Sequence, residues 1–309
     1  MEKLRTYFHD NRARKEEIPM IVLFLLPLLA VYTYFFISPS VQAFYVSLND
    51  WNGFTANMSY VGFKNFEELM GDPAFMESIR ISLIFMFGGG AIIFGISFFL
   101  SAMLATHIRF KKTMRAIIFF PSVISCVAVA LLWNFIYNTK WGLLNNFLKL
   151  VGLDQLIRTW SSTENLTGAM LAVLAWTYCG YFCVILLSAL DRVPESYIEA
   201  AKVDGANEVT IFFKIKLPMI KNIIGTAITL WVIDSIKEFG VLYAWNGSGT
   251  PPDVAITNMA VKMYITAFGR RVTVFRMGYA TAMGVVMFLF VLVLVPIVFA
   301  LFNRDKYEY

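Results

Sequence analysis

Six long apolar stretches constrain this chain more than any other feature of its sequence. Each holds about 20 or more mostly apolar residues, the length that a helix needs to cross the hydrocarbon core of a bilayer. Because backbone groups in lipid must pair within their own segment, the stretches are expected to be helices. They cover residues 18–38, 80–106, 116–137, 167–190, 219–242 and 277–302.

The composition supports the same class of protein. Hydrophobic residues make up 58% of the chain and charged residues 15%, whereas soluble domains have about 45–50% and about 25%. We therefore predict an all-α polytopic membrane protein with six transmembrane helices. The formal charge of +5 is explained by basic cytoplasmic loops, so no nucleic-acid partner is expected. The first stretch is longer than a signal-peptide core of about 7–15 residues, which favours an uncleaved span.

Lysine and arginine indicate the orientation, because they collect in cytoplasmic loops. They are frequent before the first span and in the loops after the second and fourth spans. The fifth loop is a mild exception, with Lys262, Arg270, Arg271 and Arg276. We expect both termini to be cytoplasmic. The predicted organisation is a cytoplasmic segment 1–17, a six-span domain 18–302 and a cytoplasmic tail 303–309.

The sequence contains few groups with catalytic chemistry. Cys126, Cys179 and Cys183 all fall in apolar stretches and are interpreted as packing residues rather than as a disulfide framework or a metal site. There is no H-E-x-x-H pattern and no G-x-x-x-x-G-K-[ST] phosphate loop. We therefore expect no enzyme activity, no catalytic residue, no metal and no cofactor in this chain.

The loop after the fourth span contains more structure than a simple connection requires. Its stretch EAAKVDGANEVTIFFKIKLP begins at Glu199 and ends at Pro218. Pro194 can begin a first helix, Gly205 can turn the chain with positive φ, and residues 207–215 can form a second short helix. Considered physically, this is either a docking element at the inner surface or an interfacial helix resting on lipid headgroups.

The same loop resembles the EAA loop of ABC importer permeases, with the pattern E-A-A-x-x-D-G-A, five residues, then F-x-x-I-x-L-P. The resemblance implies that residues 191–218 form the coupling loop, whose short helix docks on a cytoplasmic ATPase. The ten matching residues are Glu199, Ala200, Ala201, Asp204, Gly205, Ala206, Phe212, Ile215, Leu217 and Pro218.

The resemblance extends over nearly the whole chain and points to the carbohydrate-uptake branch, MalF-like or glycerol-phosphate-permease-like. LLPLLAVYTYFFISPSVQAFYVSLNDWNGF is similar to its first span, and MGYATAM (277–283) to the start of its sixth. The sequence departs from the family pattern in the loop after the fifth span, where residues 245–252 stand in place of the common T-x-G-G-P. The resemblance therefore does not imply that this loop contacts the binding protein. The implied fold is the MetI-like type I importer permease fold.

The resemblance also implies the assembly and its activity. The expected partners are a second permease in a heterodimer, a dimeric ABC ATPase with ATP, an extracytoplasmic solute-binding protein and membrane lipid. The location would be a bacterial or archaeal cell (inner) membrane. The permease would move a carbohydrate, delivered by the binding protein, by alternating access coupled to ATP hydrolysis in the separate ATPase. Transport by an ion gradient would instead favour a secondary transporter, for which repeats or broken helices near the midplane are typical.

Polar groups within spans are costly and are therefore candidates for the substrate pathway. Asp234, Lys237 and Glu238 are spaced so that they can line a pathway or form a structural pair. A second set of residues combines apolar faces with hydrogen-bonding edges, which suits a sugar, although aromatic residues also collect at bilayer interfaces. This set is Trp133, Asn134, Trp176, Tyr178 and Tyr181.

Two further features of the sequence each have two interpretations. Ser97, Ser101 and Ala105 recur every four residues in the second span, as do Ala91 and Gly95. Such spacing lets helices approach closely, either between subunits or within one bundle. Arg270 and Arg271 either contact the binding protein or an acidic substrate, or are solvated charges.

Overall fold

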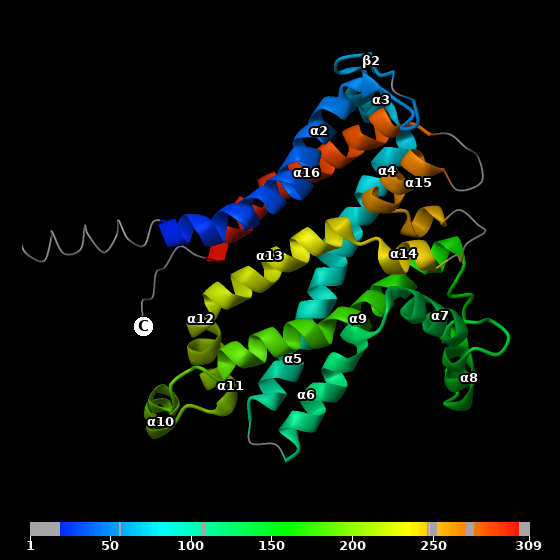
Figure 1. Ribbon diagram of the computed structural model, residues 1–309. Helices are drawn as coiled ribbons and strands as arrows, with labels where there is room; N and C mark the ends of the chain where they lie inside the picture. The colour runs from blue at the N-terminus through cyan, green and yellow to red at the C-terminus, as the bar shows by residue number, and fades with distance from the viewer. Residues whose placement is uncertain are drawn as a thin grey trace, which may run out of the picture.

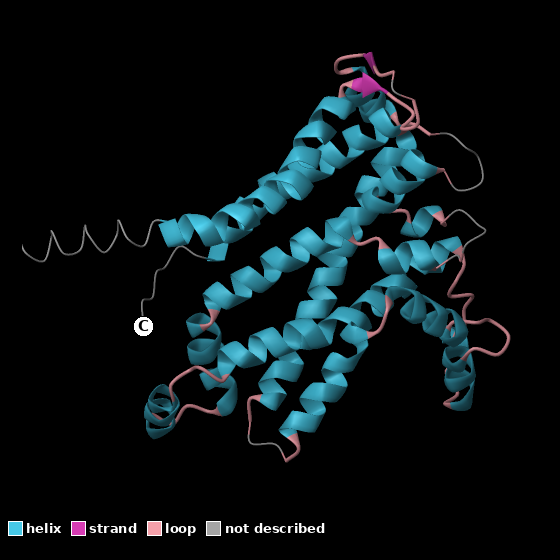
Figure 2. Cartoon of the chain, viewed as in Figure 1, coloured by secondary structure: helices cyan, strands magenta, loops and turns pink. Residues whose placement is uncertain are grey.

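The computed structural model describes residues 19–55, 57–106, 109–245, 247, 252–269 and 275–302. These residues form a helical bundle with one short two-stranded ribbon (Figure 2). Figure 1 shows that ribbon and α3 at one end of the bundle, and α10, α11 and α12 at the other. The predicted all-α class is therefore confirmed. The two-residue strands β1 and β2 are Asn49–Asp50 and Ser59–Tyr60.

The described residues contain six apolar elements that can cross a membrane, but two of them are not straight. Four are continuous helical spans, and the other two are helix pairs bent by 97° and 72°. The predicted count of six therefore holds if each bent pair crosses once. The continuous spans are Pro19–Ser47, Pro73–Leu104, Thr163–Leu190 and Met277–Phe302, and the bent pairs are Lys111–Val123 with Cys126–Ile136 and Glu208–Met219 with Lys221–Ala244.

The predicted span 116–137 is not one continuous helix. The segment divides into α6 (Lys111–Phe119), η3 (Phe120–Val123) and α7 (Cys126–Ile136). Pro121 lacks a backbone N–H, and Ile124 adopts an extended conformation that ends the helical path. Ser125 then starts α7, because its Oγ accepts a hydrogen bond from the Ala128 N–H.

The first span is longer than the predicted 18–38. Helix continues from residue 19 through the π-helical η1 (Thr33–Ile37) into α2 (Ser38–Ser47). α2 lies along α16 (Met277–Phe302), as Figure 1 shows. The large apolar side chains of residues 20–37 are almost all exposed in the single chain, as expected of a helix surrounded by lipid or a partner helix.

The second span starts seven residues earlier than predicted. It consists of α4 (Pro73–Leu83), the π-helical η2 (Ile84–Gly89) and α5 (Gly90–Leu104). Asp72 accepts a hydrogen bond from the Ala74 N–H at 2.9 Å, and Pro73 occupies the first helical position. An acidic cap followed by proline is a strong helix start, so the outer end of this span extends beyond the apolar stretch.

The π-helical segment of the second span contacts the fifth. Trp231 of α13 (Lys221–Lys237) donates its indole N–H to the Met86 carbonyl at 2.8 Å. The indole lies so close that a Cβ added at Gly90 would be 2.7 Å from Trp231 Nε1. The missing side chain at Gly90 therefore makes room for the tryptophan.

Small residues of the second span pack inside this chain. The Ser97 hydroxyl donates to the Ile93 carbonyl at 2.6 Å and lies 2.8 Å from the Cys179 carbonyl of α9 (Thr163–Leu190). Ser97 and Ser101 are both buried against that neighbouring helix. For these two serines the within-bundle interpretation is confirmed. Ala91 and Gly95 lie on the exposed side of the helix, where the subunit-interface interpretation remains a prediction.

An ion pair closes the end of the bundle that carries the β1–β2 ribbon. Arg276, just before α16, donates from both terminal nitrogens to the Glu68 carboxylate of α3 (Lys64–Gly71), each at 2.6 Å. These hydrogen bonds hold the pKa of Glu68 below its usual value. Two-point Arg–carboxylate contacts fix geometry as well as distance. Arg276 is therefore part of the outer cap, whereas Arg270 and Arg271 lie outside the described residues.

The remaining elements are short and connect the spans. These elements are α8 (Leu143–Leu150), η4 (Asp154–Leu156), α14 (Gly240–Ala244), η6 (Val254–Ile256) and α15 (Met259–Phe268).

The third and fourth spans are in backbone contact. A Cβ added at Gly180 of α9 would lie 1.9 Å from the Ile118 carbonyl oxygen of α6. At the inner end, the Asp191 carboxylate accepts hydrogen bonds from Lys111 at 3.0 Å and Arg115 at 3.4 Å. α6 and α9 are therefore joined both by close packing and by charge.

Replacing Gly180 should loosen this pair. We expect Gly180→Ala to lower the free energy of unfolding by about 1–3 kcal/mol, because the backbone it meets cannot move aside as a side chain would. Gly168→Ala is the matched control in the same helix, since a Cβ there meets nothing within 4 Å. Thermal unfolding in detergent measures both, and equal stability of the two variants would contradict the packing argument.

Candidate functional site

The loop 191–218 is built around a glycine that ends its first helix. α10 (Glu195–Val203) is followed by Gly205 with φ +78°. The Ala206 N–H donates to the Ala201 carbonyl at 2.9 Å, and the Gly205 N–H donates to the Lys202 carbonyl at 3.0 Å. This pair of bonds is the Schellman motif, which requires a left-handed residue at the position of Gly205. The D-G-A part of the motif is thus explained by backbone geometry.

The second half of the loop starts with its own cap. Asn207 accepts a hydrogen bond from the Thr210 N–H at 2.8 Å and begins a helical segment. A salt bridge of 3.0 Å joins Lys202 to Glu208 across the turn and lowers the pKa of the Glu208 carboxyl. The turn between the helices therefore has a defined shape. The segment consists of α11 (Glu208–Ile211), the π-helical η5 (Phe212–Lys216) and α12 (Leu217–Met219).

Apolar side chains of this loop point in two directions. Ile211 is fully buried, and Phe212 and Leu217 pack on the cluster formed by the inner ends of α9 and α13. In contrast, Val203 is 88% exposed, Val209 65% and Phe213 62%. Exposed apolar residues on an otherwise charged loop are typical of a docking surface.

The ten motif residues have different environments in the single chain. Ala201 is buried, and the partly buried residues anchor the loop to the bundle, whereas the exposed ones are free to contact a partner or lipid. The partly buried residues are Ala206, Phe212, Ile215 and Leu217, and the exposed ones are Glu199, Ala200, Asp204, Gly205 and Pro218.

A polar cavity of about 460 Å³ lies where the two bent spans meet α9. The ionisable groups of the bent fifth span reach it, together with hydroxyl groups of the third and fourth spans. Its lining residues are Ser122, Ile124, Cys126, Val129, Thr177, Tyr178, Asp234, Lys237, Glu238, Phe239, Gly240 and Val241.

The fifth span ends its long helix at this cavity. α13 stops at Lys237, Phe239 adopts φ −130° and ψ −44°, and α14 begins at Gly240. The predicted span 219–242 is therefore interrupted inside its outer half. The Glu238 carbonyl, which loses its helical partner, accepts a hydrogen bond from the Asn258 amide at 2.5 Å. A broken helix at membrane depth is tolerated where its backbone groups are paired in this way.

The Glu238 side chain is held by two donors. It is only 8% exposed. The Tyr178 hydroxyl donates to one carboxylate oxygen at 2.5 Å, and the Val241 N–H donates to the other at 3.4 Å. A buried carboxylate needs such donors to compensate for lost hydration.

Asp234 and Lys237 form the pair predicted from their spacing. The Lys237 ammonium lies 3.5 Å from Asp234 Oδ1, and both side chains are about half exposed, at 60% and 49%. This geometry fits both interpretations of these residues, because the pair also lines the cavity. Its role in transport remains a prediction.

The predicted substrate-pathway residues divide into two groups. Tyr178, Asp234, Lys237 and Glu238 line the cavity. The other four lie elsewhere: Trp133 and Trp176 pack edge to face on an aromatic core, Tyr181 is exposed beside Phe182, and Asn134 donates to the Trp245 carbonyl at 3.0 Å. The role of both groups in the pathway remains a prediction.

Sequence reasoning missed several residues of this site. Asn258 is fully buried and begins α15, because its side-chain oxygen accepts a hydrogen bond from the Val261 N–H. Its side-chain amide also donates to the Glu238 carbonyl at the break in the fifth span. Its position before an apolar run was an available helix-start signal. Cys126 was interpreted as a packing residue, but it is exposed and lines the cavity, whereas Cys183 is buried as expected. Within the described residues, no group of three or more His, Cys, Asp or Glu could hold a metal.

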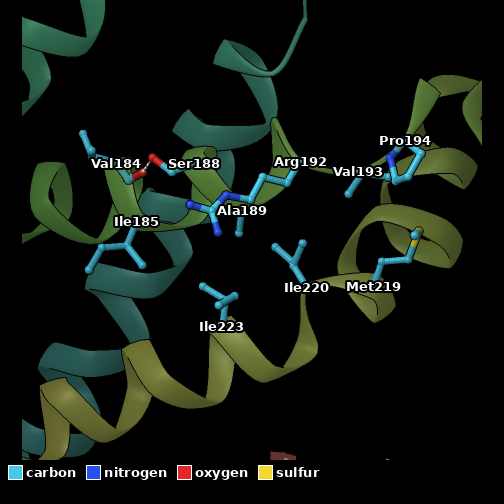
Figure 3. Close-up of a pocket in the computed structure, with 10 residues that line it drawn as sticks. All are labelled: Val184, Ile185, Ser188, Ala189, Arg192, Val193, Pro194, Met219, Ile220 and Ile223. Atoms are coloured by element: carbon cyan, nitrogen blue, oxygen red, sulfur yellow. Dashed lines mark hydrogen bonds between the residues drawn. The ribbon is translucent and has the colours of Figure 1, made fainter. Parts of the chain in front are cut away.

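A second pocket, of about 570 Å³, lies at the end of the bundle that carries the loop 191–218. Isoleucines of α9 and α13 form its walls, and the Arg192 side chain extends over the space between Ile185 and Ile220 (Figure 3). Pro194 comes from the loop itself, and Met219 directly follows it. A displacement of the loop would therefore change the shape of this pocket.

Comparison with known proteins identifies the class. The pattern of the binding-protein-dependent transport system inner membrane component family matches residues 91–306. Because this is more than half of the chain, the protein belongs to that family of membrane permeases. The resemblance to ABC importer permeases is thus confirmed.

Curated relatives cover nearly the full chain. The probable ABC transporter permease protein YurN of Bacillus subtilis is 31% identical, covering 93% of this chain and 97% of the relative. The diacetylchitobiose uptake system permease protein NgcF of Streptomyces coelicolor is 31% identical over 95% and 85%. The sn-glycerol-3-phosphate transport system permease protein UgpA of Pectobacterium atrosepticum is 30% identical over 94% and 96%.

Solved structures support the fold. A chain of a bacterial alginate ABC transporter, crystallised with an alginate pentasaccharide-bound periplasmic protein, superposes with a TM-score of 0.76. The sequences are 21% identical, and the match covers 93% of this chain and 94% of the other. The expected importer permease fold is therefore confirmed.

Removing the donor to Glu238 should destabilise the break in the fifth span. We expect Tyr178→Phe to lower the free energy of unfolding by about 1.5–3 kcal/mol, since a buried carboxylate loses its closest donor. Tyr181→Phe, an exposed position in the same helix, is the control and should change stability little. Thermal unfolding in detergent is the measurement. A Tyr178→Phe variant as stable as the control would show that the hydrogen bond is not needed.

Proposed function

We propose that this chain is the permease subunit of an ATP-driven importer and moves a carbohydrate delivered by an external solute-binding protein. The observation that carries the proposal is the loop 191–218, in which a glycine-dependent turn presents exposed Val203, Val209 and Phe213 at one end of the membrane bundle. These residues supply the apolar contacts that an ATPase subunit would cover. The named relatives support the importer class and, through NgcF, a saccharide cargo.

The proposed orientation has the coupling loop in the cytoplasm. The loop and the basic start of α6 lie at the same end of the bundle, opposite the β1–β2 ribbon (Figure 1). Basic residues favour the cytoplasmic side. Both chain termini are then cytoplasmic, and α3 with the ribbon lies on the side of the binding protein. Segments 1–17 and 303–309 lie outside the described residues.

The proposed mechanism uses the two pockets in turn. Solute released from the binding protein would first contact the polar cavity beside Glu238, which a second permease subunit would close from the open side. ATP-driven movement of the coupling loop would then displace α12 and the start of α13. Because Met219, Ile220 and Ile223 line the inner pocket, this movement would open a route toward the cytoplasm.

The Gly205 turn provides a sharp test. In Gly205→Val, a β-branched residue must adopt φ +78°, which costs about 1–2 kcal/mol or more and corresponds to a 5- to 30-fold loss of the correct loop conformation. We therefore expect recovery of the ATPase subunit with the tagged chain to fall at least about fivefold. The measurement is purification from native membranes in mild detergent, followed by quantitative mass spectrometry.

Gly152→Val is the matched control. Gly152 also has a positive φ, +75°, and like Gly205 has no neighbour within 4 Å of an added Cβ, but it follows α8 in an outer loop. The same backbone strain there should leave ATPase recovery unchanged. If the wild-type chain is recovered without any ATPase, or if solute uptake proceeds on an ion gradient without ATP, the proposed function is wrong.

A further inference from the structure

The polar cavity beside the fifth span has an unusual charge balance for a site that would accept an anion. Its acidic and basic lining residues are Asp234, Glu238 and Lys237. The Lys237 ammonium is the one cationic group among these lining residues, and it lies 3.5 Å from the Asp234 carboxylate. The lining therefore has two acidic groups against one basic group.

Hydrogen-bond donors are also scarce in this lining. The Ser122 hydroxyl donates to the Phe119 carbonyl at 2.7 Å, and the Thr177 hydroxyl donates to the Val173 carbonyl at 2.8 Å. The Tyr178 hydroxyl donates to Glu238. Each hydroxyl group has thus used its one proton within the chain and offers the cavity lone pairs.

We propose that this cavity accepts a neutral or amine-bearing saccharide and excludes saccharides that carry a carboxylate or phosphate. This inference rests on the proposed function and specifies the substrate class of that same site. Sugar hydroxyls can donate to the oxygen atoms of the lining, and an ammonium group would add an attraction to Asp234. An anionic group has only acceptor atoms and would face acceptors, with a single lysine already paired.

The substrate proposed for this chain differs from the anionic substrates in the names of two similar proteins. One relative is a permease for sn-glycerol-3-phosphate, and a similar structure belongs to an importer of the acidic polysaccharide alginate. An anionic substrate favours cationic and N–H donor groups at its contact points. The described lining of this cavity has the opposite character.

The native Cys126 thiol can report the electrostatic potential in this cavity through its rate of reaction with charged reagents. It is exposed, lines the cavity and packs directly against Gly240, where an added Cβ would be 2.9 Å from the sulfur. Its thiolate reacts with a methanethiosulfonate reagent to form a mixed disulfide, and methanesulfinate leaves. Two reagents of similar size serve as probes, one with a trimethylammonium group and one with a sulfonate group.

The experiment compares the two reaction rates on the full chain, purified with its co-purifying subunits at low salt. Mass spectrometry of the peptide containing Cys126 follows the reaction, and each rate is divided by the rate of the same reagent with 2-mercaptoethanol. The thiol pKa cancels in this ratio. We expect the cationic reagent to be favoured about fivefold or more, since a charged cavity concentrates counter-ions.

Substitutions show which groups create the preference. Asp234→Asn should lower the ratio toward 1, and Lys237→Met should raise it. Asp154→Asn, an exposed acid in the outer loop after α8, should leave it unchanged. A wild-type ratio of 1 or below would overturn the inference, as would a cavity that neither reagent can enter.

The outcomes for the inference and for the proposed function can be separated. The labelling ratio needs no transport and no ATP, so an anion-favouring cavity would remove the substrate class and leave the importer assignment in place. Recovery of the chain without an ATPase would remove the importer assignment, whatever the labelling ratio.

Discussion

Every backbone N–H and C=O inside a bilayer needs a partner, and this structure depends on how that requirement is met where two spans break. An intact helix satisfies the requirement by itself. The third and fifth spans give up part of their helices, and side chains replace the lost bonds. The side-chain amides of Asn258 and Asn134 donate hydrogen bonds to the carbonyls of Glu238 and Trp245, respectively. The Ser125 hydroxyl oxygen accepts a hydrogen bond from the Ala128 N–H.

These substitute bonds also create the polar cavity. If α13 continued as a regular helix through Phe239, the Glu238 carboxylate could not reach the Val241 N–H within the same turn. The extended residue Ile124 likewise opens the third span beside Cys126. Both breaks therefore face the same space, and the irregular backbone is confined to a place where protein and cavity, rather than lipid, surround it.

The fold was largely predictable from the sequence because it depends on local signals. Apolar stretches of about 20 residues indicate the membrane-spanning segments. Asp72 and Pro73 mark the start of a helix, and Gly205 marks the turn within the loop 191–218. The contacts that form the site link distant residues instead. Tyr178 and Glu238 are 60 residues apart, and Ser97 and Cys179 are 82 apart. One sequence contains no signal that pairs them. Pro121 within an apolar stretch was an available signal for the break in the third span, and the prediction of one helix there did not use it.

The contacts of Asp191 tie the loop 191–218 to two helices of the bundle. This residue ends α9 and begins the loop, yet it holds two basic side chains of α6, and Gly180 places the same two helices in backbone contact further along. α6 and α9 are therefore joined at two points along their lengths. A force applied at the loop would reach α9 through the chain and α6 through the Asp191 contacts, so both helices would move together, and with them Thr177 and Tyr178 of α9, which line the cavity.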